Sequence, residues 1–284
     1  MKRKQRARTD FLRLPGLANL ELLHASNLTH DYPPHIHEQQ CIVLVHHGSE
    51  TTTVRGTAHT VLPGGIFILD PEELHSSLSI DADYRAFKIQ AAEFRRIATE
   101  IVGFASGPPY FSSFAIDDAH VFRLLVRLYV NLEENNSLLE QESDFLSTMA
   151  MLLSRHNKKN PVLQKVYKED RNVDRVREYL KATYRENISL SELTLLTNLD
   201  RFYLLRVFAN KVGVPPHEFQ TQLRIAHARE LIRKGYSISE AALETGFFDQ
   251  SHLSRHFKRI VGMTPGEYLS GCNIVQESAQ SSCP

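Results

Sequence analysis

Hydrophobic and polar positions in the last third of the chain follow a helical period, and one pattern is written twice. Ser189-Leu190-Ser191-Glu192 recurs as Ser237-Ile238-Ser239-Glu240, and the apolar, glycine and proline positions that follow recur with it. Each Ser-x-Ser-Glu is a capping box, in which the serine hydroxyl accepts from a free amide of the first helical turn and the glutamate reaches back. We therefore expect a helix to begin near residue 190 and another near residue 238.

In each copy a tight turn leads into a second helix. In the second copy Gly246 favours the left-handed conformation that ends a helix, and Asp249 can cap the next helix. The inward apolar positions are Leu253, Phe257 and Ile260 in this copy, and Leu204, Phe208 and Val212 in the first. The outward positions are Gln250, Ser251, Ser254, Arg255 and Lys258, and in the first copy Arg201, Phe202, Leu205, Arg206 and Lys211. This division predicts two helix-turn-helix units, whose second helices reach base edges in a major groove; a pair of ordinary helical hairpins is the alternative.

The first 116 residues carry a different pattern, with short runs rich in Val, Ile, Thr and Leu between glycine and proline corners. The runs are 20–27, 40–46, 51–55, 60–62, 65–69 and 84–90, and turns are expected at Gly48-Ser49, Pro63-Gly64-Gly65 and Asp70-Pro71. Regular short strands of this kind predict a small antiparallel barrel or jelly roll.

Between these two parts lie two amphipathic helices, 117–133 and 138–156. Phe122, Leu125 and Leu132 repeat at helical spacing in the first, as do Phe145 and Met149 in the second. We expect one apolar face of these helices to pack on the barrel. The break at 157–161 ends the second helix.

The second copy resembles the signature of AraC/XylS-type bacterial transcription regulators. The resemblance covers about residues 170–270 and rests on Ala241-Ala242, Gly246-Phe247, Asp249-Gln250-Ser251-His252-Leu253-Ser254-Arg255-His256-Phe257-Lys258-Arg259, Gly262-Met263-Thr264-Pro265 and Glu267-Tyr268. It implies two helix-turn-helix units joined by a long helix, with both recognition helices on one face of the DNA. Residues 216–233 supply that helix, and Pro216 suits its first position. Leu205 departs from the family pattern, so a thymine methyl contact is expected there rather than a hydrogen bond.

The strand-rich part resembles the cupin-type sensing domain that is often joined to this DNA-binding module. Pro33-Pro34-His35-Ile36-His37 and Pro71-Glu72-Glu73-Leu74-His75 carry this resemblance. In metal-binding cupins a His-x-His, a glutamate four residues later and a distant histidine ligate one ion. By that resemblance His35, His37 and His75 fill three places, and Cys41 stands where the glutamate would be.

Three imidazoles and a thiolate suit zinc or another borderline-soft divalent ion. The alternative is that His35, His37, Cys41 and His75 line an effector pocket that holds no metal or other cofactor. Without the glutamate, oxygenase or isomerase chemistry loses support. A Ser/His/Asp triad, a phosphate loop and paired carboxylates are not apparent either, so we expect the protein not to be an enzyme.

Composition agrees with a DNA-binding regulator once the charge is divided between the parts. The 284-residue chain has no formal net charge, but residues 172–271 hold 14 Lys and Arg against 11 Asp and Glu, which suits phosphate contact. Cys41, Cys272 and Cys283 show no framework spacing, which indicates free thiols in a reducing compartment. No apolar run approaches the roughly 20 residues of a membrane helix, so we expect a cytoplasmic protein that associates with the nucleoid when bound and not with the membrane.

We therefore predict an α+β protein: an N-terminal antiparallel barrel with following helices, and an all-α C-terminal domain. The segments are 1–16, a basic arm; 17–116, the barrel; 117–157, a dimerisation segment; 158–171, a linker; 172–271, the DNA-binding domain; and 272–284, a tail. The arm could be disordered, grip phosphate or, as in relatives, close over the ligand.

The predicted function is promoter binding under the control of a small-molecule effector. The family resemblance implies a homodimer and activation through RNA polymerase. A cupin enzyme fused to a DNA-binding domain, or a constitutive DNA-binding protein with an assembly-only barrel, are the alternatives.

Overall fold

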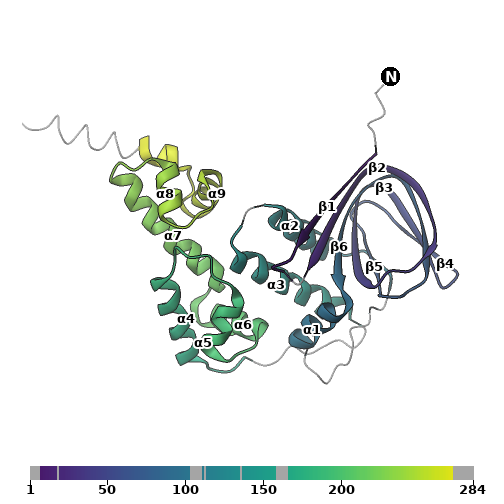
Figure 1. Ribbon diagram of the computed structural model, residues 1–284, viewed down its shortest axis with the longest axis horizontal. Helices are drawn as coiled ribbons and strands as arrows, with labels where there is room; N and C mark the ends of the chain where they lie inside the picture. The colour runs from purple at the N-terminus through teal and green to yellow at the C-terminus, as the bar shows by residue number, and fades with distance from the viewer. Residues whose placement is uncertain are drawn as a thin grey trace, which may run out of the picture. The chain divides into compact units, whose positions relative to one another are not determined.

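The computed structural model describes residues 7–17, 19–102, 111, 113–134, 136–157 and 166–270. These residues form two compact units (Figure 1). The first lies within residues 1–134 and 144–165, and the second within residues 135–143 and 166–284. Residues 1–6 of the predicted arm, 158–165 of the predicted linker and the whole predicted tail lie outside the described residues.

The first unit is built on an antiparallel sheet of seven strands. The neighbours run in the order β1, β2, β6, β3, β5, β7, and β4 pairs with β3. The long strands curve round to enclose a space, as the predicted barrel requires (Figure 1). The strands are β1 (Arg8–Leu14), β2 (Leu20–His35), β3 (Gln39–Val54), β4 (Thr57–Val61), β5 (Ile66–Leu69), β6 (His75–Gln90) and β7 (Ala115–Ile116).

Side-chain alternation gives this sheet two apolar faces. Leu23 of β2 and Ala86 of β6 are cross-strand partners that line the enclosed space. Their neighbours Leu22 and Phe87 are also partners, and both are fully buried on the other face. There the ring of Phe87 meets Tyr129 of a covering helix, with 5.5 Å between centroids. The sheet is therefore packed from outside while its inner face is left to line a cavity.

Two expectations for this unit are wrong. No turn forms at Gly48, because β3 runs unbroken from Gln39 to Val54. Gly48 has a φ of 69°, and the register with β6 shifts on both sides of His47, which marks a bulge. A Cβ on Gly48 would lie 2.2 Å from the carbonyl oxygen of Asp81, so the close approach requires glycine. Secondly, Arg8–Leu14 of the predicted arm is strand β1, paired with β2.

Three helices follow the strands: α1 (Ala91–Val102), α2 (Ala119–Glu133) and α3 (Leu138–His156). The bounds of α2 and α3 confirm the two predicted amphipathic helices, whereas α1 was not predicted. Asp118 caps α2 by accepting from the amides of His120 and Val121. Its carboxylate also pairs with Arg155 and His156 at the end of α3. Although burial opposes it, the Arg155 hydrogen bond helps to hold the pKa of Asp118 well below its usual range.

The second unit contains the predicted duplication. Its helices are α4 (Asp170–Ala182), α5 (Leu190–Thr197), α6 (Arg201–Val212), α7 (Pro216–Arg233), α8 (Ile238–Glu244) and α9 (Gln250–Val261). Both capping boxes are formed, at Ser189 and Ser237, and α7 has the predicted bounds. Helix α4 begins at Asp170, two residues inside the segment that we assigned to the linker.

Each helix pair packs on the central helix α7. In the second copy the core joins Ala241 of α8 and Leu253 and Phe257 of α9 to Ile225 of α7. Our expectation that Ile260 would join this inward face is wrong, since its side chain is 41% exposed. Ile260 lies in the last turn of α9 and borders a shallow groove with polar side chains of α7, which do not cover it.

Candidate effector pocket and DNA interface

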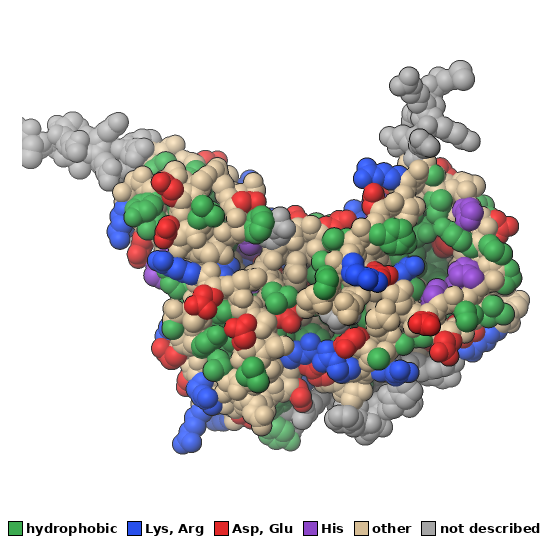
Figure 2. Space-filling model, in the orientation of Figure 1, with side chains coloured by type: hydrophobic (Ala, Val, Ile, Leu, Met, Phe, Trp, Pro, Cys, Tyr) green, Lys and Arg blue, Asp and Glu red, His purple; other side chains and the backbone are tan. Residues whose placement is uncertain are grey.

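A cavity of about 270 Å³ lies inside the curved sheet of the first unit. Figure 2 shows its mouth as a hollow on the right-hand side, with histidine side chains (purple) gathered at the rim. Strands β1, β2, β3, β5 and β6 supply its walls. The lining residues are Thr9, Phe11, Leu23, Tyr32, His35, His37, Cys41, Val43, Glu50, Thr52, Phe67, Leu69, His75, Ser77, Tyr84, Ala86 and Lys88.

The three histidines predicted from the sequence come together at this cavity. His35 ends β2 and His75 begins β6, where the two residues are register partners. Their ring centroids are 4.3 Å apart, and the ring of His37 lies 4.9 Å from that of His75 and 6.3 Å from that of His35. Residues 40 positions apart in the sequence thus form one imidazole cluster.

A backbone carbonyl group orients each of these rings. The distances from Nδ1 to the carbonyl oxygen are 2.8 Å from His35 to Pro33, 3.0 Å from His37 to Gln39 and 2.8 Å from His75 to Glu73. Because a carbonyl oxygen only accepts, Nδ1 carries the hydrogen and Nε2 of the neutral ring keeps a lone pair. Burial lowers the pKa of His37 to about 4 and also lowers the pKa of His75. These two rings are therefore neutral near pH 7.

Cys41 lies beside this cluster as a protonated thiol, whereas a metal ligand would be a thiolate. Its Sγ is 3.8 Å from Nδ1 of His37, and its side chain is buried. Burial raises the pKa of the thiol to about 12. Since the thiolate is the form that binds metal, the arrangement favours the three imidazoles over Cys41 as donors.

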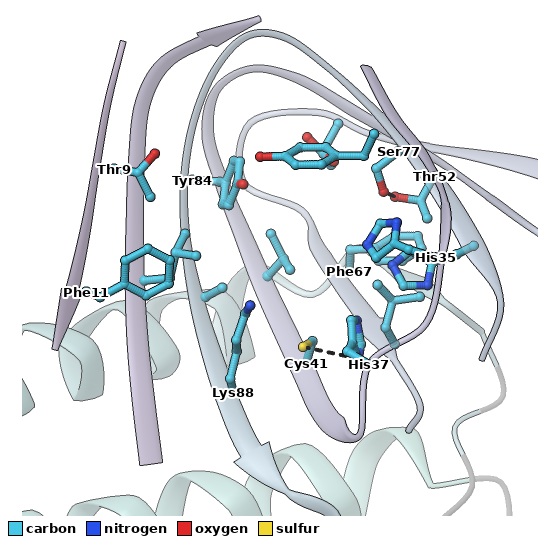
Figure 3. A pocket seen from close by; sticks show the side chains of 17 residues that line it. Thr9, Phe11, His35, His37, Cys41, Thr52, Phe67, Ser77, Tyr84 and Lys88 are labelled. Carbon is cyan, nitrogen blue, oxygen red and sulfur yellow. Dashed lines mark hydrogen bonds between the residues drawn. The ribbon is translucent and has the colours of Figure 1, made fainter. Parts of the chain in front are cut away.

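The other end of the cavity carries hydroxyl groups. Figure 3 shows Lys88, Cys41 and His37 near one end and Tyr84, Thr52 and Ser77 near the other. The hydroxyls of Thr52 and Ser77 are 2.9 Å apart. Glu50 accepts from the hydroxyl of Ser79 at 2.6 Å, and burial raises the pKa of its carboxyl group. Burial likewise raises the pKa of Tyr84, which keeps its phenol protonated.

Lys88 is the cation of the pocket. It lies on β6 between its register partners Glu21 of β2 and Cys41 of β3. The carboxylate of Glu21 already accepts from Arg13 and Gln39. Thr9 and Phe11 of β1 also line the cavity, with Thr9 beside Tyr84 and Phe11 nearer Lys88 (Figure 3). The pocket therefore combines one amine, neutral imidazoles and several hydroxyls within an apolar frame.

The second unit presents the polar face predicted for α9. Ser251, Arg255 and Lys258 are exposed and Ser254 is half-buried. Asp249 caps the helix as expected, accepting from the amide of His252 at 2.7 Å. Gln250 is also exposed, and its side-chain oxygen accepts from Ser239 of α8.

Helix α6 differs from the prediction at two positions. Phe202 and Leu205 are 7% and 4% exposed, so our expectation that they face outward is wrong. The reason is that α6 packs against α4, α5 and α7, which enclose more than one of its sides. Arg201 and Arg206 are half-buried, and the Arg206 guanidinium lies 5.7 Å from the centroid of the Phe202 ring. Lys211 is exposed and pairs with Asp174 at 3.0 Å.

Comparisons with known proteins match both units. An AraC-like ligand binding domain matches residues 17–150, and a helix-turn-helix domain matches residues 193–271. The chain belongs to the AraC family of transcriptional regulators. This AraC-family regulator is thus a DNA-binding protein with a ligand-binding N-terminal domain. Among its described residues, no helix is long and apolar enough to cross a membrane.

The regulator is similar to several named proteins. It is 29% identical over 248 residues to the uncharacterized HTH-type transcriptional regulator YbfI of Bacillus subtilis, covering 86% of this chain and 90% of that protein. It is 28% identical over 153 residues to the transcriptional regulatory protein HptR of Staphylococcus aureus, covering 54% and 57%. A crystal structure of ToxT from Vibrio cholerae O395 is 15% identical, with a TM-score of 0.35, and covers 88% of this chain and 96% of that one.

Several pocket residues of the regulator were not predicted. Thr9 and Phe11 enter the site because β1 pairs with β2, and Lys88 enters because β6 lies between β2 and β3. The sequence predicted a strand over 84–90, and a strand has a side-chain period of two residues. This period could have placed Tyr84, Ala86 and Lys88 on one face, but not shown that this face is the inner one.

Proposed function

We propose that this regulator binds promoter DNA through both helix-turn-helix units, and that a small polyhydroxylated carboxylate in the barrel controls the binding. The observation that carries the effector class is the set of Nε2 lone pairs at one end of a pocket that also holds Lys88. Imidazole lone pairs accept from hydroxyl groups, and an amine pairs with a carboxylate. At about 270 Å³ the cavity is just smaller than the roughly 300–1,000 Å³ of most ligand pockets, which suits a small molecule.

The DNA contacts that we propose are the side chains that remain on the outward faces of α6 and α9. They are Arg201, Arg206, Lys211, Gln250, Ser251, Ser254, Arg255 and Lys258. The exposed Arg255 and Lys258 support this proposal most directly, because a side chain must project from the protein surface to contact a base edge or a phosphate.

Two measurements on the full-length protein test the proposal. Sequencing the DNA that the protein retains from a random library should yield a defined site. Affinity for that site should then change with glucuronate more than with glucose, a neutral sugar of the same ring size. Lys88→Met should remove the preference for the acid, whereas Lys88→Arg should keep most of it. If hydroxylated acids of every size tested leave both the melting temperature and the DNA affinity of the protein unchanged, the proposed effector class is wrong.

The same lone pairs support a second candidate, a divalent metal ion held by His35, His37 and His75. The carbonyl groups fix the tautomer that metal ligation through Nε2 requires. Bound there, the ion would supply a Lewis-acidic site for an oxygen of the effector. Metal analysis of protein purified without chelators should then find near-stoichiometric ion that His37→Ala loses. Metal-free protein with a normal effector response would end this candidate.

We propose further that the regulator is a homodimer and activates transcription by contacting RNA polymerase. A groove of about 190 Å³ between α2 and α3 supports the dimer; Leu124, Arg127, Leu128, Asp144, Ser147, Thr148 and Met151 line it. Transcription from the selected site with purified RNA polymerase should rise when the regulator and effector are added together. Transcription that falls would identify a repressor.

We also propose that the barrel performs no catalysis. If the full-length protein converts an effector that changes its DNA affinity, the fused-enzyme alternative is correct. If DNA affinity is the same with every metabolite tested, the barrel serves assembly alone.

A further inference from the structure

A short segment before and within the first turns of α3 contacts both helix-turn-helix units. Residues 135–143 belong to the second unit. The backbone N–H of Leu138 donates to Oδ1 of Asn187 at 3.0 Å, and the carboxylate of Glu142 accepts from the amide of Leu190 at 2.6 Å. Both contacts are made at the start of α5. Glu142 thereby satisfies a free amide at the N-terminus of α5, in addition to the Ser189 capping box.

The same segment also contacts the recognition helix α9. The guanidinium of Arg255 donates to Oδ1 of Asn136 at 2.9 Å. Glu140, one turn further on, lies against the flank of α9, where its carboxylate oxygen is 3.8 Å from Nε2 of His256. One ligand atom each of Glu140, His252 and His256 falls within 4.8 Å of the others, and all three residues are buried.

The protonation of the two imidazoles decides what this buried cluster does. Nδ1 of His252 accepts from the backbone N–H of Phe248 at 3.3 Å, and Nδ1 of His256 accepts from the guanidinium of Arg259 at 3.2 Å. A neutral ring that accepts at Nδ1 carries its hydrogen on Nε2. Such a ring has no lone pair for a metal ion there. In His256 this N–H lies near the Glu140 carboxylate but beyond hydrogen-bond distance, at 3.8 Å.

Charge on the central helix completes the cluster. Arg224 of α7 is buried, and it donates to the carbonyl oxygens of Tyr184 and Glu186 in the loop between α4 and α5. Burial lowers the pKa of Arg224 to about 10, while the nearby charge of Glu140 acts to raise it. The buried charges of Glu140 and Arg224 therefore attract each other. This cluster holds the segment to α7 and α9 together.

We propose that residues 136–142 form an intramolecular latch that competes with DNA for Arg255. The inference rests on the proposed base-reading role of Arg255. A guanidinium that reads guanine uses two N–H donors at the base edge, and Asn136 occupies donor capacity of the same group. In this proposal, the contact between Asn136 and Arg255 breaks when the guanidinium turns to the base edge. Helix α3 begins two residues after Asn136 and continues to His156, in the first unit.

The test is a double-mutant cycle in the full-length protein, using the DNA site that the wild-type protein selects. Asn136→Ala should raise affinity about two- to fivefold, the size of one exposed hydrogen bond, and should have no effect in an Arg255→Ala background. Asn210→Ala, which removes an exposed amide from α6, should leave affinity unchanged. An equal gain in both backgrounds, no gain, or a loss of affinity with Asn136→Ala would overturn the latch.

A second measurement does not depend on any variant. Backbone amides of residues 136–142 should exchange hydrogen faster when the wild-type protein binds its DNA, because the latch is released. Unchanged or slower exchange there would overturn the proposal, as would near-stoichiometric zinc that His256→Ala removes. Failure of the wild-type protein to select any DNA sequence would instead overturn the proposed function itself, and with it the latch.

Discussion

The carbonyl group of Arg185, in the loop between α4 and α5, lies directly against the backbone of Gly246, in the turn between α8 and α9. A Cβ on Gly246 would be 2.2 Å from this carbonyl oxygen, and the φ of Gly246 is 80°. Because the two residues belong to different helix-turn-helix units, their contact joins the units independently of α7. The spacing of two DNA-reading helices depends on such contacts.

Replacing Gly246 with alanine should therefore be far more costly than an ordinary glycine substitution. Gly246→Ala adds a clash with the Arg185 backbone to the strain of a positive φ, and we expect a loss of roughly 2–4 kcal/mol in the stability of the second unit. Gly262 is the matched control, since it also has a positive φ of 87° but would place a Cβ in open space. Gly262→Ala should cost about 1 kcal/mol. Calorimetric melting of both variants checks this; equal losses would show that the Arg185 contact has no special weight.

Acidification should destabilise the second unit through two buried histidines. Burial lowers the pKa of His252 to about 4 and of His256 to about 3, from an ordinary value of 6.5. In the unfolded chain both rings take up a proton below about pH 6.5, whereas the folded rings resist it. The contribution of each histidine to the free energy of unfolding is thus fully present above about pH 6.5 and is lost as the pH falls toward about 4. At about pH 5 each histidine should lower the free energy of unfolding by about 1–2 kcal/mol.

Unfolding of the DNA-binding unit by urea at about pH 7 and about pH 5 measures this loss. The double variant His252→Gln/His256→Gln lacks both titrating rings, so its stability should change less over the same interval. If the variant and the wild-type protein lose equal stability between these pH values, other groups cause the acid sensitivity.

The proposed dimer can be disrupted at the groove between α2 and α3 without disturbing the core. Leu124 borders this groove and is half-buried, whereas Leu128 is 1% exposed and belongs to the core. Leu124→Glu should give folded monomers, since it places an additional charge in the proposed interface in place of an apolar side chain. Leu128→Glu should instead unfold the protein. Sedimentation at micromolar concentration distinguishes these outcomes, and an unmodified protein that sediments as a monomer with and without effector would rule out the dimer.

Local signals in the sequence predicted the helices well because each signal acts within one turn. The Ser189 and Ser237 capping boxes and Asp249 before α9 satisfy free amides within a few residues. Pro216 suits the first position of α7 because it has no N–H to leave unpaired there. The histidine cluster was found for a different reason. Its members were identified by resemblance to cupins, and the register of β2 with β6 then brings His35 and His75 together.

The other features could not be predicted because they depend on contacts between residues that are far apart in the sequence. Helical periodicity assigns one inward face to α6, but three neighbouring helices bury Phe202 and Leu205 on another. Gly48 and Ser49 are residue types that are common in turns. The close approach of Gly48 to Asp81 of β6 instead places Gly48 in a bulge within β3. The contact between Asn136 and Arg255 joins residues 119 positions apart. No pattern along the chain indicates such a pair.

The duplicated unit leads to a prediction about how DNA is read. If α6 and α9 face the same side of the duplex, they enter successive major grooves about 34 Å apart. A single protomer should then protect two short patches about ten base pairs apart. Arg206 and Arg255 occupy equivalent positions of the two copies, and an arginine there can donate two hydrogen bonds to guanine.

Arg255→Ala should therefore cost about 1–3 kcal/mol of binding and relax base preference in one patch, and Arg206→Ala should do the same in the other. Replacing Lys258 with alanine should weaken all sequences alike and flatten the salt dependence, because we assign Lys258 to phosphate. Binding of each variant to a library randomised across both patches separates these roles. If both arginine variants lose affinity for all sequences alike and keep base preference at every position, then Arg206 and Arg255 contact the DNA phosphates and do not read the bases.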